Sequence, residues 1–318
     1  MRLGDPAHAL RNRTRHRAGR IGLALGSGGA RGCAHLGVIQ ALEEAGFSIA
    51  CVAGTSMGAL VGAVFASGRL DALREVARGM DWRQVLYYFA ETPFRPKAGL
   101  IDGRRIVSFI RRYVTLEAIE NLPIPFAACA TDIMSGEEVV LDRGDIIDAV
   151  RASISIPGIF APVHRAGRFL VDGGLVNPVP VQLARHLGAD TVIAVDVNHM
   201  AEPLPPRRSP PTRRADAVPH ASARRLPEAF LAGLRGKLHD LPWPPRRRDK
   251  ASLSVFDVIG NAIRILETQV TETRFKIEPP DLLIRPRLRD VAILDFHKAD
   301  AIIAEGFAAA RAALGAAT

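Results

Sequence analysis

The sequence of 318 residues has only three cysteines and no long apolar run. Cys33, Cys51 and Cys129 lie far apart in apolar surroundings, without the paired spacing of a zinc site. We therefore expect reduced, mostly buried thiols, which favour an intracellular compartment and exclude a disulfide scaffold. No apolar stretch approaches the roughly 18 residues that a membrane-spanning helix needs. Nothing in the sequence predicts a metal site or another cofactor.

The N-terminal 20 residues also lack the features of a targeting signal. They are rich in arginine but contain no apolar core of the kind found in secretory signals. They contain no serine and carry Asp5, which fits a transit peptide poorly. The sequence therefore predicts a basic N-terminal tail at 1–19 on a cytoplasmic protein.

The net charge of +9 comes from two segments. Residues 1–20 hold six arginines and one aspartate, and residues 201–250 hold twelve basic and five acidic residues. The two segments therefore carry +5 and +7, and the remaining residues sum to −3. Such segments attract nucleic acid or an anionic membrane surface, or are simply solvated tails. Because they lack interleaved aromatic residues for base stacking, nucleic acid is the least favoured partner.

Residues 201–250 also contain ten of the 22 prolines, so we expect no packed core there. Between Leu226 and Leu241, apolar residues recur at near-helical spacing among arginine and lysine, with Trp243 just beyond. This pattern fits either a flexible linker or a basic amphipathic helix at a membrane interface. Regular patterning resumes at residue 253. The segment is therefore interpreted as an insertion that interrupts one domain spanning 20–318.

Outside these segments, apolar runs alternate with amphipathic stretches. Strands are predicted at 21–25, 49–53, 125–131, 137–141, 168–171, 191–197 and 281–284, and helices at 33–45, 59–66, 145–152, 253–275 and 295–314. Residues 69–122 are expected to be mostly helical, with a loop near 92–99, and Asn177 with Pro178 predicts a further helix start. This alternation predicts an α/β fold whose largely parallel sheet is covered by helices on both faces.

The pentapeptide Gly-Thr-Ser-Met-Gly at 54–58 lies between a predicted strand and a predicted helix. This is the context of a G-x-S-x-G nucleophile elbow, in which flanking glycines allow a tight turn that leaves the serine hydroxyl projecting. The unpaired amides at a helix start favour negative charge near Ser56. An ordinary glycine-rich turn would have the same pattern. Taken as an elbow, it predicts a serine hydrolase.

A second glycine-rich loop, Gly-Ser-Gly-Gly-Ala-Arg-Gly at 26–32, joins the first predicted strand to the first predicted helix. Backbone amides in such a loop can hold an anion. A phosphate-binding Walker loop would need a Gly-Lys-Ser/Thr ending, and a dinucleotide fingerprint would need glycine in place of Arg31. The loop is therefore best suited to an oxyanion.

A serine nucleophile needs a base, and Asp172 is the first candidate. It follows a predicted strand and precedes two glycines, a position at which a carboxylate can approach another backbone, although Asp-Gly is also a common turn. Asp132, at another strand end, is the second candidate. Four histidines after the elbow lie in ordered segments without glycine-rich surroundings: His164, His186, His199 and His297. Of these, His186 and His297 are predicted helix residues and are interpreted as structural.

In their order, residues 26–32, 54–58 and 172–174 resemble the three signature blocks of the patatin-like phospholipase family, and residues 152–157 resemble a fourth. The resemblance covers 20–198 strongly and 253–314 more loosely, as in bacterial members. It implies a three-layer patatin-like fold and a serine lipid acyl hydrolase of phospholipase A, lysophospholipase or esterase type, with a Ser56–Asp172 dyad and an acyl-enzyme on Ser56. It further implies an oxyanion hole at Gly28, Gly29, Ala30, Arg31 and Met57, with Arg31 also holding the glycine loop in shape, and motif glycines at Gly26, Gly32, Gly54, Gly58, Gly173 and Gly174.

An ordinary aspartate with a pKa near 3.9 is a weak base at neutral pH, so Asp172 needs a raised pKa or a well-aligned hydrogen bond. A water-poor apolar cleft would raise the pKa and would also accept an acyl chain. A non-catalytic lipid-binding or regulatory protein with the same fold is the alternative. The insertion at 201–250 departs from the family pattern, and we interpret it as a lid or a tether that contacts an anionic membrane surface.

Overall fold

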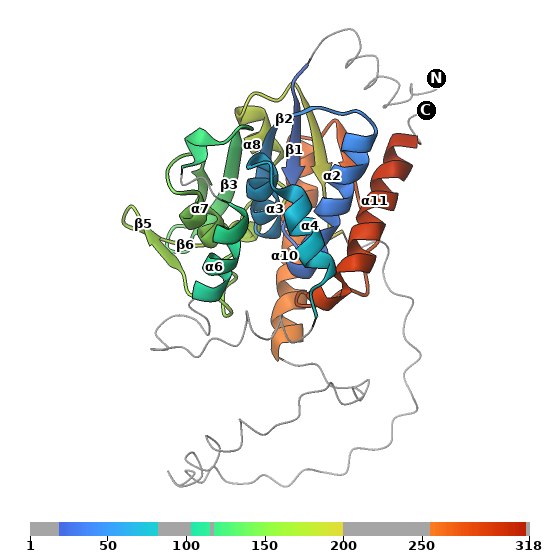
Figure 1. The fold of residues 1–318 in the computed structure, drawn as a ribbon. Helices are drawn as coiled ribbons and strands as arrows, with labels where there is room; N and C mark the ends of the chain where they lie inside the picture. Colours follow the sequence, from blue (N-terminus) through green and yellow to red (C-terminus); the bar gives the residue numbers. More distant parts are fainter. Residues whose placement is uncertain (1–18, 82–102, 115–117, 200–254, 316–318) are drawn as a thin grey trace, which may run out of the picture. The chain divides into compact units, whose positions relative to one another are not determined.

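The computed structural model describes residues 19–81, 103–114, 118–199 and 255–315 (Figure 1). Eight strands form one sheet in the order β5-β6-β3-β2-β1-β7-β8, with β4 paired to β3. The parallel strands are β1 (Ile21–Leu25), β2 (Ile49–Thr55), β3 (Phe126–Asp132), β7 (Thr191–Val195) and β8 (Leu282–Ile284). The antiparallel pairings add β4 (Glu138–Leu141), β5 (Val163–Arg165) and β6 (Arg168–Asp172).

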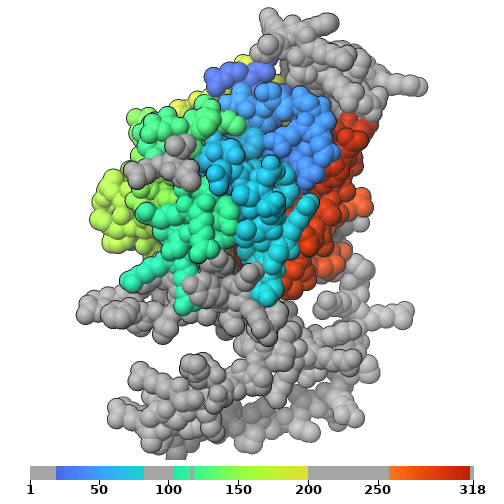
Figure 2. All heavy atoms as spheres, viewed as in Figure 1, coloured from blue at the N-terminus to red at the C-terminus, as the bar shows by residue number. Residues whose placement is uncertain are grey.

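Helices surround this sheet. The α-helices are α2 (Ala34–Glu44), α3 (Met57–Ala66), α4 (Leu70–Arg78), α6 (Arg104–Tyr113), α7 (Ile146–Ser153), α8 (Val181–His186), α10 (Val255–Ile277) and α11 (Ala299–Gly315). Short 3-10 turns lie at η1 (Gly29–Cys33), η2 (Ile119–Asn121), η3 (Gly173–Leu175) and η4 (Phe296–Lys298). Figure 2 shows side chains of α2, α4, α6 and α11 covering the sheet on the face seen there.

Alternate side chains of the central strands enter two apolar cores on opposite faces of the sheet. Leu23 and Leu25 of β1 join the core that contains α2, α3, α7 and α11, whereas Ala24 joins the core that contains α8. Successive side chains of a strand point to opposite faces. Because both faces are buried, the parallel strands are apolar throughout, as the sequence indicated. The prediction of an α/β fold with a mostly parallel sheet and helices on both faces is confirmed.

Two local predictions differ from the structure. The helix expected to start at Asn177 begins at Val181 instead, because Asn177 is held in place by other strands. Its carbonyl accepts from Thr55 Oγ1 at 2.8 Å and its Nδ2 donates to Glu138 at 2.7 Å. The strand β5 was not predicted. It forms a hairpin with β6 through a turn in which Ala166 (φ 49°) and Gly167 (φ 76°) both have positive φ.

The chain returns to the same sheet after the inserted segment. β8 pairs in parallel with β7, and α11 packs against α2. The helix predicted at 295–314 begins at Ala299, after η4. Residues 1–18, the loop predicted near 92–99 and the whole insertion at 201–250 lie outside the described residues, so the predicted domain boundaries stay a prediction. Within the described ranges, no helix combines the length and apolar character needed to cross a membrane.

Candidate active site

Ser56 occupies the sharp turn between β2 and α3. Its backbone has φ 55° and ψ −121°, a region that side-chain-bearing residues rarely adopt and that is typical of strained functional positions. A Cβ atom built on Gly58 would lie 2.1 Å from the carbonyl oxygen of Leu25, so only glycine allows α3 to start this close to β1. The pentapeptide therefore has the geometry of a nucleophile elbow.

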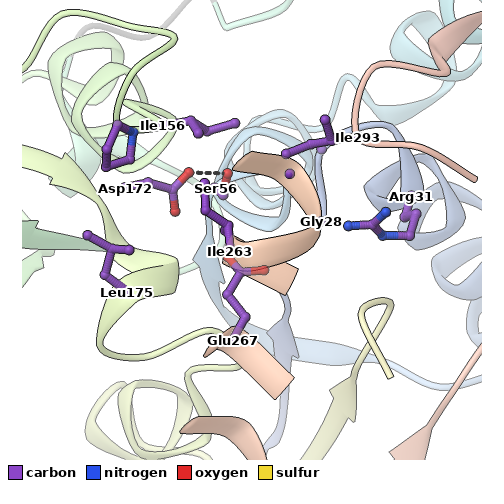
Figure 3. A pocket seen from close by; sticks show the side chains of 12 residues that line it. Gly28, Arg31, Ser56, Ile156, Asp172, Leu175, Ile263, Glu267 and Ile293 are labelled. Atoms are coloured by element: carbon purple, nitrogen blue, oxygen red, sulfur yellow. Dashed lines mark hydrogen bonds between the residues drawn. The ribbon is translucent and has the colours of Figure 1, made fainter. Parts of the chain in front are cut away.

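The register of β3 brings Asp172 to Ser56. β3 pairs with β2 up to Thr55 opposite Cys129, and its next residue, Ala130, pairs with Asp172 at the end of β6. Ser56 thus lies one residue beyond the partner of Cys129, and Asp172 is the partner of the next residue of β3. Ser56 Oγ donates a hydrogen bond to Asp172 Oδ2 at 2.5 Å (Figure 3).

The environment of Asp172 makes it a stronger base than an ordinary aspartate. The residue is buried, and desolvation raises the pKa of its carboxyl to about 6. Hydrogen bonds from Ser56 Oγ and from the Gly174 amide, which reaches Oδ1 at 2.8 Å, lower the pKa and oppose part of this effect. At neutral pH the ionised form therefore dominates, yet its affinity for a proton is above that of a solvated aspartate.

The stretch 152–157 supports both of these residues. Ser153 Oγ accepts a hydrogen bond from the Ser56 amide at 2.9 Å and donates to the Cys129 carbonyl at 2.6 Å. The Ser155 carbonyl accepts from the Asp172 amide at 2.9 Å. Sequence reasoning identified this stretch as a motif but gave it no role. Its observed role is to fix the backbone of Ser56 and of Asp172.

The glycine-rich loop after β1 lies beside Ser56. Among the five predicted oxyanion-hole residues, the Ala30 amide donates to the Ile293 carbonyl at 2.9 Å and the Arg31 amide to the Gly28 carbonyl at 3.2 Å. In the described part of the chain, the amides of Gly28, Gly29 and Met57 have no such acceptor. These three amides are therefore the ones available to a ligand.

The side chain of Arg31 holds the glycine-rich loop in place. Its buried guanidinium donates from Nε to Asn198 Oδ1 and from Nη1 to the Val291 carbonyl, each at 2.8 Å. Burial lowers the pKa of Arg31 to about 10, so it stays protonated at neutral pH. The side chain thus ties the loop to the segments that follow β7 and β8.

The predicted motif glycines lie where the backbone is in close contact with neighbouring segments. A Cβ atom built on any of them would come within 3.0 Å of another atom: Gly26, Gly32, Gly54, Gly58, Gly173 and Gly174. Real Cβ atoms essentially never approach this closely, so a larger residue at any of these positions would displace a neighbouring segment or side chain.

One pocket brings these parts together (Figure 3). Its lining residues come from segments distant in sequence: Gly28, Gly29, Arg31, Ser56, Ile156, Pro157, Asp172, Leu175, Gly260, Ile263, Glu267 and Ile293. The cavity among them measures about 10 Å³, which holds roughly one water molecule. A ligand larger than one water molecule must therefore displace part of the lining, most of which is apolar.

Glu267 was not singled out by the sequence analysis. It lies on α10, is buried, and lines the pocket with Ser56 and Asp172. Its carboxyl accepts from Ser27 Oγ at 2.6 Å and from Asn198 Nδ2 at 2.5 Å. Burial, followed by the charge of Asp172, raises the pKa of Glu267 to about 8. Its spacing from Gly260 and Ile263 is the available sequence signal, because it places all three on one helix face.

The rival base, Asp132, has a local structural role. Its Oδ1 accepts from the Met134 amide at 3.0 Å in the turn after β3, and it does not line the pocket. Arg168 Nε lies 3.9 Å from its Oδ2. Asp132 is therefore a turn residue.

Among the described residues, no histidine lines the pocket. The ring of His164 packs against Phe169, and the Nε2 atom of His186 lies 3.7 Å from Asp142. His35, on α2, is buried and donates from Nε2 to the Gly26 carbonyl at 2.7 Å. Burial lowers the pKa of His35 to about 4, so it is neutral and helps to hold the glycine-rich loop.

A group of potential metal ligands lies away from the pocket. Ligand atoms of Asp196, His199 and Glu272 come within 4.8 Å of one another. However, Arg285 donates to Asp196 Oδ2 at 3.1 Å and also to Glu272. The guanidinium already balances this acidic pair, so the group fits an ion pair better than a cation site.

Comparisons with known proteins bear on the whole chain. A family model described as patatin-like phospholipase matches residues 23–185. An uncharacterized NTE family protein of Mycobacterium tuberculosis (strain ATCC 25618 / H37Rv) is 36% identical over 331 residues, covering 93% of this chain and 91% of that protein. Patatin-like phospholipase domain-containing protein 6 of Mus musculus is 37% identical over 187 residues, which cover 57% of this chain and 14% of that protein. Among solved structures, VipD from Legionella pneumophila matches 93% of this chain and 67% of its own, with a TM-score of 0.47 and 14% identity. The chain belongs to the patatin-like phospholipase family.

Proposed function

We propose that this protein is a serine lipid acyl hydrolase in which Ser56 is the nucleophile and Asp172 the base. The observation that carries the proposal is the 2.5 Å hydrogen bond from Ser56 Oγ to a buried carboxyl whose pKa is raised to about 6. A base with a pKa near the working pH combines a large ionised fraction with a useful proton affinity.

The reaction proceeds through an acyl-enzyme. Asp172 takes the proton of Ser56 as Oγ bonds to the carbonyl carbon of the ester. The negative charge on the former carbonyl oxygen rests on the amides of Gly28, Gly29 and Met57, the last of them at the positive end of α3. The bond to the leaving alcohol then breaks, and the alcohol takes the proton from Asp172. A water molecule then attacks the acyl carbon and gives a proton to Asp172. Asp172 passes this proton to Ser56 Oγ as the bond between Oγ and the acyl carbon breaks and the fatty acid leaves.

The lining favours acyl chains as the substrate class. Ile156, Leu175, Ile263 and Ile293 surround the dyad. Each methylene that leaves water for such surroundings contributes about 0.8 kcal/mol. A phospholipid, a lysophospholipid or a simple acyl ester all present the required carbonyl with an apolar chain.

A peripheral membrane contact through residues 201–250 fits the same function. This segment carries +7 and runs directly into the chain that forms α10, a helix that lines the pocket. Positive charge there favours an anionic lipid surface. Co-sedimentation with anionic vesicles of the full chain and of a deletion of 201–250 tests the contact, and equal binding of both proteins would refute it.

The catalytic proposal is tested by hydrolysis of a fluorogenic acyl ester and of mixed phospholipid micelles. The wild type is expected to hydrolyse both, and Ser56→Ala to hydrolyse neither while remaining folded by circular dichroism. The ratio of the two rates in the wild type reports whether lipid is preferred. If Ser56→Ala retains wild-type rates, or the wild type is inactive on every ester, the non-catalytic lipid-binding alternative takes its place.

A further inference from the structure

A second buried carboxyl group lies beside the proposed base. A Cβ atom built on Gly174 would lie 2.0 Å from Glu267 Oε1 and 3.1 Å from Asp172 Oδ1, so these two oxygens are no more than about 5 Å apart. Glu267 reaches this place from α10, and Figure 3 shows it in the pocket with Ser56 and Asp172. Two carboxylates this close in a desolvated site oppose each other's ionisation.

The contacts of Glu267 connect three parts of the site. Its Oε1 accepts from Ser27 in the glycine-rich loop, and its Oε2 accepts from Asn198, which in turn accepts from Arg31. Gly260 and Ile263, on the same helix, line the pocket. The carboxyl thus joins α10 to the loop whose amides are proposed to hold the oxyanion.

Burial first, and then the charges around Glu267, raise its pKa and favour its neutral form. Asp172 on β6 and Asp196 after β7 raise its pKa, whereas Arg31 lowers it, and Arg264 lies nearby on α10 itself. Arg31 reaches the carboxyl through Asn198, and neither direct hydrogen-bond partner of Glu267 carries a positive charge. Near pH 7 the two carboxyls together therefore hold one proton, mainly on Glu267.

We propose that Glu267 is a positioning residue of the Ser56–Asp172 site: its carboxyl holds the glycine-rich loop against α10, and once ionised it places a second negative charge beside the reacting serine. This inference rests on the proposed function. A negative charge in a water-poor site opposes formation of the oxyanion. Activity is therefore expected to fall as Glu267 loses its proton.

The consequence is a bell-shaped dependence of kcat/KM on pH. The ascending limb belongs to Asp172, which acts as a base only when ionised, and is expected near pH 6. The descending limb belongs to Glu267 and is expected near pH 8. His35, with a pKa of about 4, and Arg31, with a pKa of about 10, keep their charge states between these limbs.

The test compares kcat/KM from pH 5 to 10 on a water-soluble acyl ester, corrected for spontaneous hydrolysis. Glu267→Gln is expected to lose the descending limb and to keep the ascending one. The matched control is Glu272→Gln, which lies on the same helix but binds Arg285 outside the pocket, and it is expected to keep both limbs. The rate of Ser56 labelling by a fluorophosphonate over the same pH range checks that the limb reflects reaction at the serine and not product release.

A second variant keeps the inference testable if Glu267→Gln does not fold. The hydrogen bond from Ser27 lowers the pKa of Glu267, so Ser27→Ala is expected to move the descending limb to higher pH. The inference is overturned if the wild type has no descending limb, if Glu267→Gln keeps it, or if Ser27→Ala leaves it in place. Those outcomes, with activity that still requires Ser56 and Asp172, leave the proposed function intact, whereas a wild type inactive on every ester overturns both.

Discussion

The two walls of the pocket are built in different ways. The wall that holds Ser56 and the glycine-rich loop comes from residues 26–58, in which short glycine-rich turns follow two adjacent parallel strands. The opposite wall comes from α10, whose Glu267 bonds Ser27 across 240 positions in sequence. The first wall carries the proposed nucleophile and the available amides, and the second adds a buried carboxyl. The turn that holds Ser56 is thus encoded by neighbouring residues, whereas the approach of Asp172 and the protonation of the site depend on long-range packing.

The largest expected effect concerns the base beside the first wall. Asp172→Asn is expected to lower kcat/KM by about a thousandfold, because asparagine can accept the Ser56 hydrogen bond but cannot take its proton. Ester hydrolysis measures the loss. Asp132→Asn is the matched control, since Asp132 also ends a strand and its turn bond to Met134 survives the change. Full activity in Asp172→Asn together with a loss in Asp132→Asn would reverse the assignment.

An intermediate effect is expected where β6 meets the second wall. Gly174→Ala places a Cβ atom 2.0 Å from Glu267 Oε1, so the Glu267 carboxyl with its hydrogen bonds, α10 or the Asp172 turn must shift. A displacement of this kind is expected to cost about a hundredfold in kcat and to lower the free energy of unfolding by about 1 to 3 kcal/mol. Urea unfolding and ester hydrolysis measure the two effects.

The control for that change is Gly79→Ala. Gly79 has φ −81° at the end of α4, and an added Cβ atom would meet nothing closer than 3.7 Å. We expect wild-type activity and stability from this variant. If Gly174→Ala behaves in the same way, the two walls are not tightly coupled.

The smallest expected effect concerns the support behind the nucleophile. Ser153→Ala removes the acceptor of the Ser56 amide and the donor to the Cys129 carbonyl. We expect kcat to fall about tenfold, which corresponds to about 1.4 kcal/mol, with little change in KM. Ser67→Ala also removes one serine-to-carbonyl bond, at the end of α3, and should leave the rate unchanged. Equal rates in the two variants would mean that Ser153 does not position Ser56.

Sequence reasoning predicted most of the strands because parallel strands covered on both faces are continuous apolar runs. It missed β5, whose Ala-Gly turn is a weak hairpin signal, and it started α8 too early at Asn177. The Asn-Pro pair has the composition of a helix start, but tertiary bonds to Thr55 and Glu138 hold Asn177 outside the helix. At Asn177, tertiary hydrogen bonds therefore override the local preference for a helix start.

For the candidate site, the order of the motifs predicted Ser56, Asp172 and the glycine-rich loop as candidates, with Asp132 as a rival base, and the structure brings the first three together at one pocket. The same reasoning could not find Glu267, because an isolated glutamate on a helix gives no local sign of burial. It also could not separate Gly28, Gly29 and Met57 from Ala30 and Arg31 as sources of available amides. For Ala30 that distinction depends on the Ile293 carbonyl, which approaches the loop from a distant segment, and for Arg31 it depends on a turn bond to the Gly28 carbonyl.

The sequence by itself determined the alternation of strands and helices, the elbow and the loop that follows β1, because these depend on neighbouring residues and on glycines in tight turns. The tertiary structure alone decided which carboxyl meets Ser56, through the register of β3 against β2 and β6. It also decided the proton affinities of Asp172 and Glu267, because those follow from burial and from charges brought together across the whole chain.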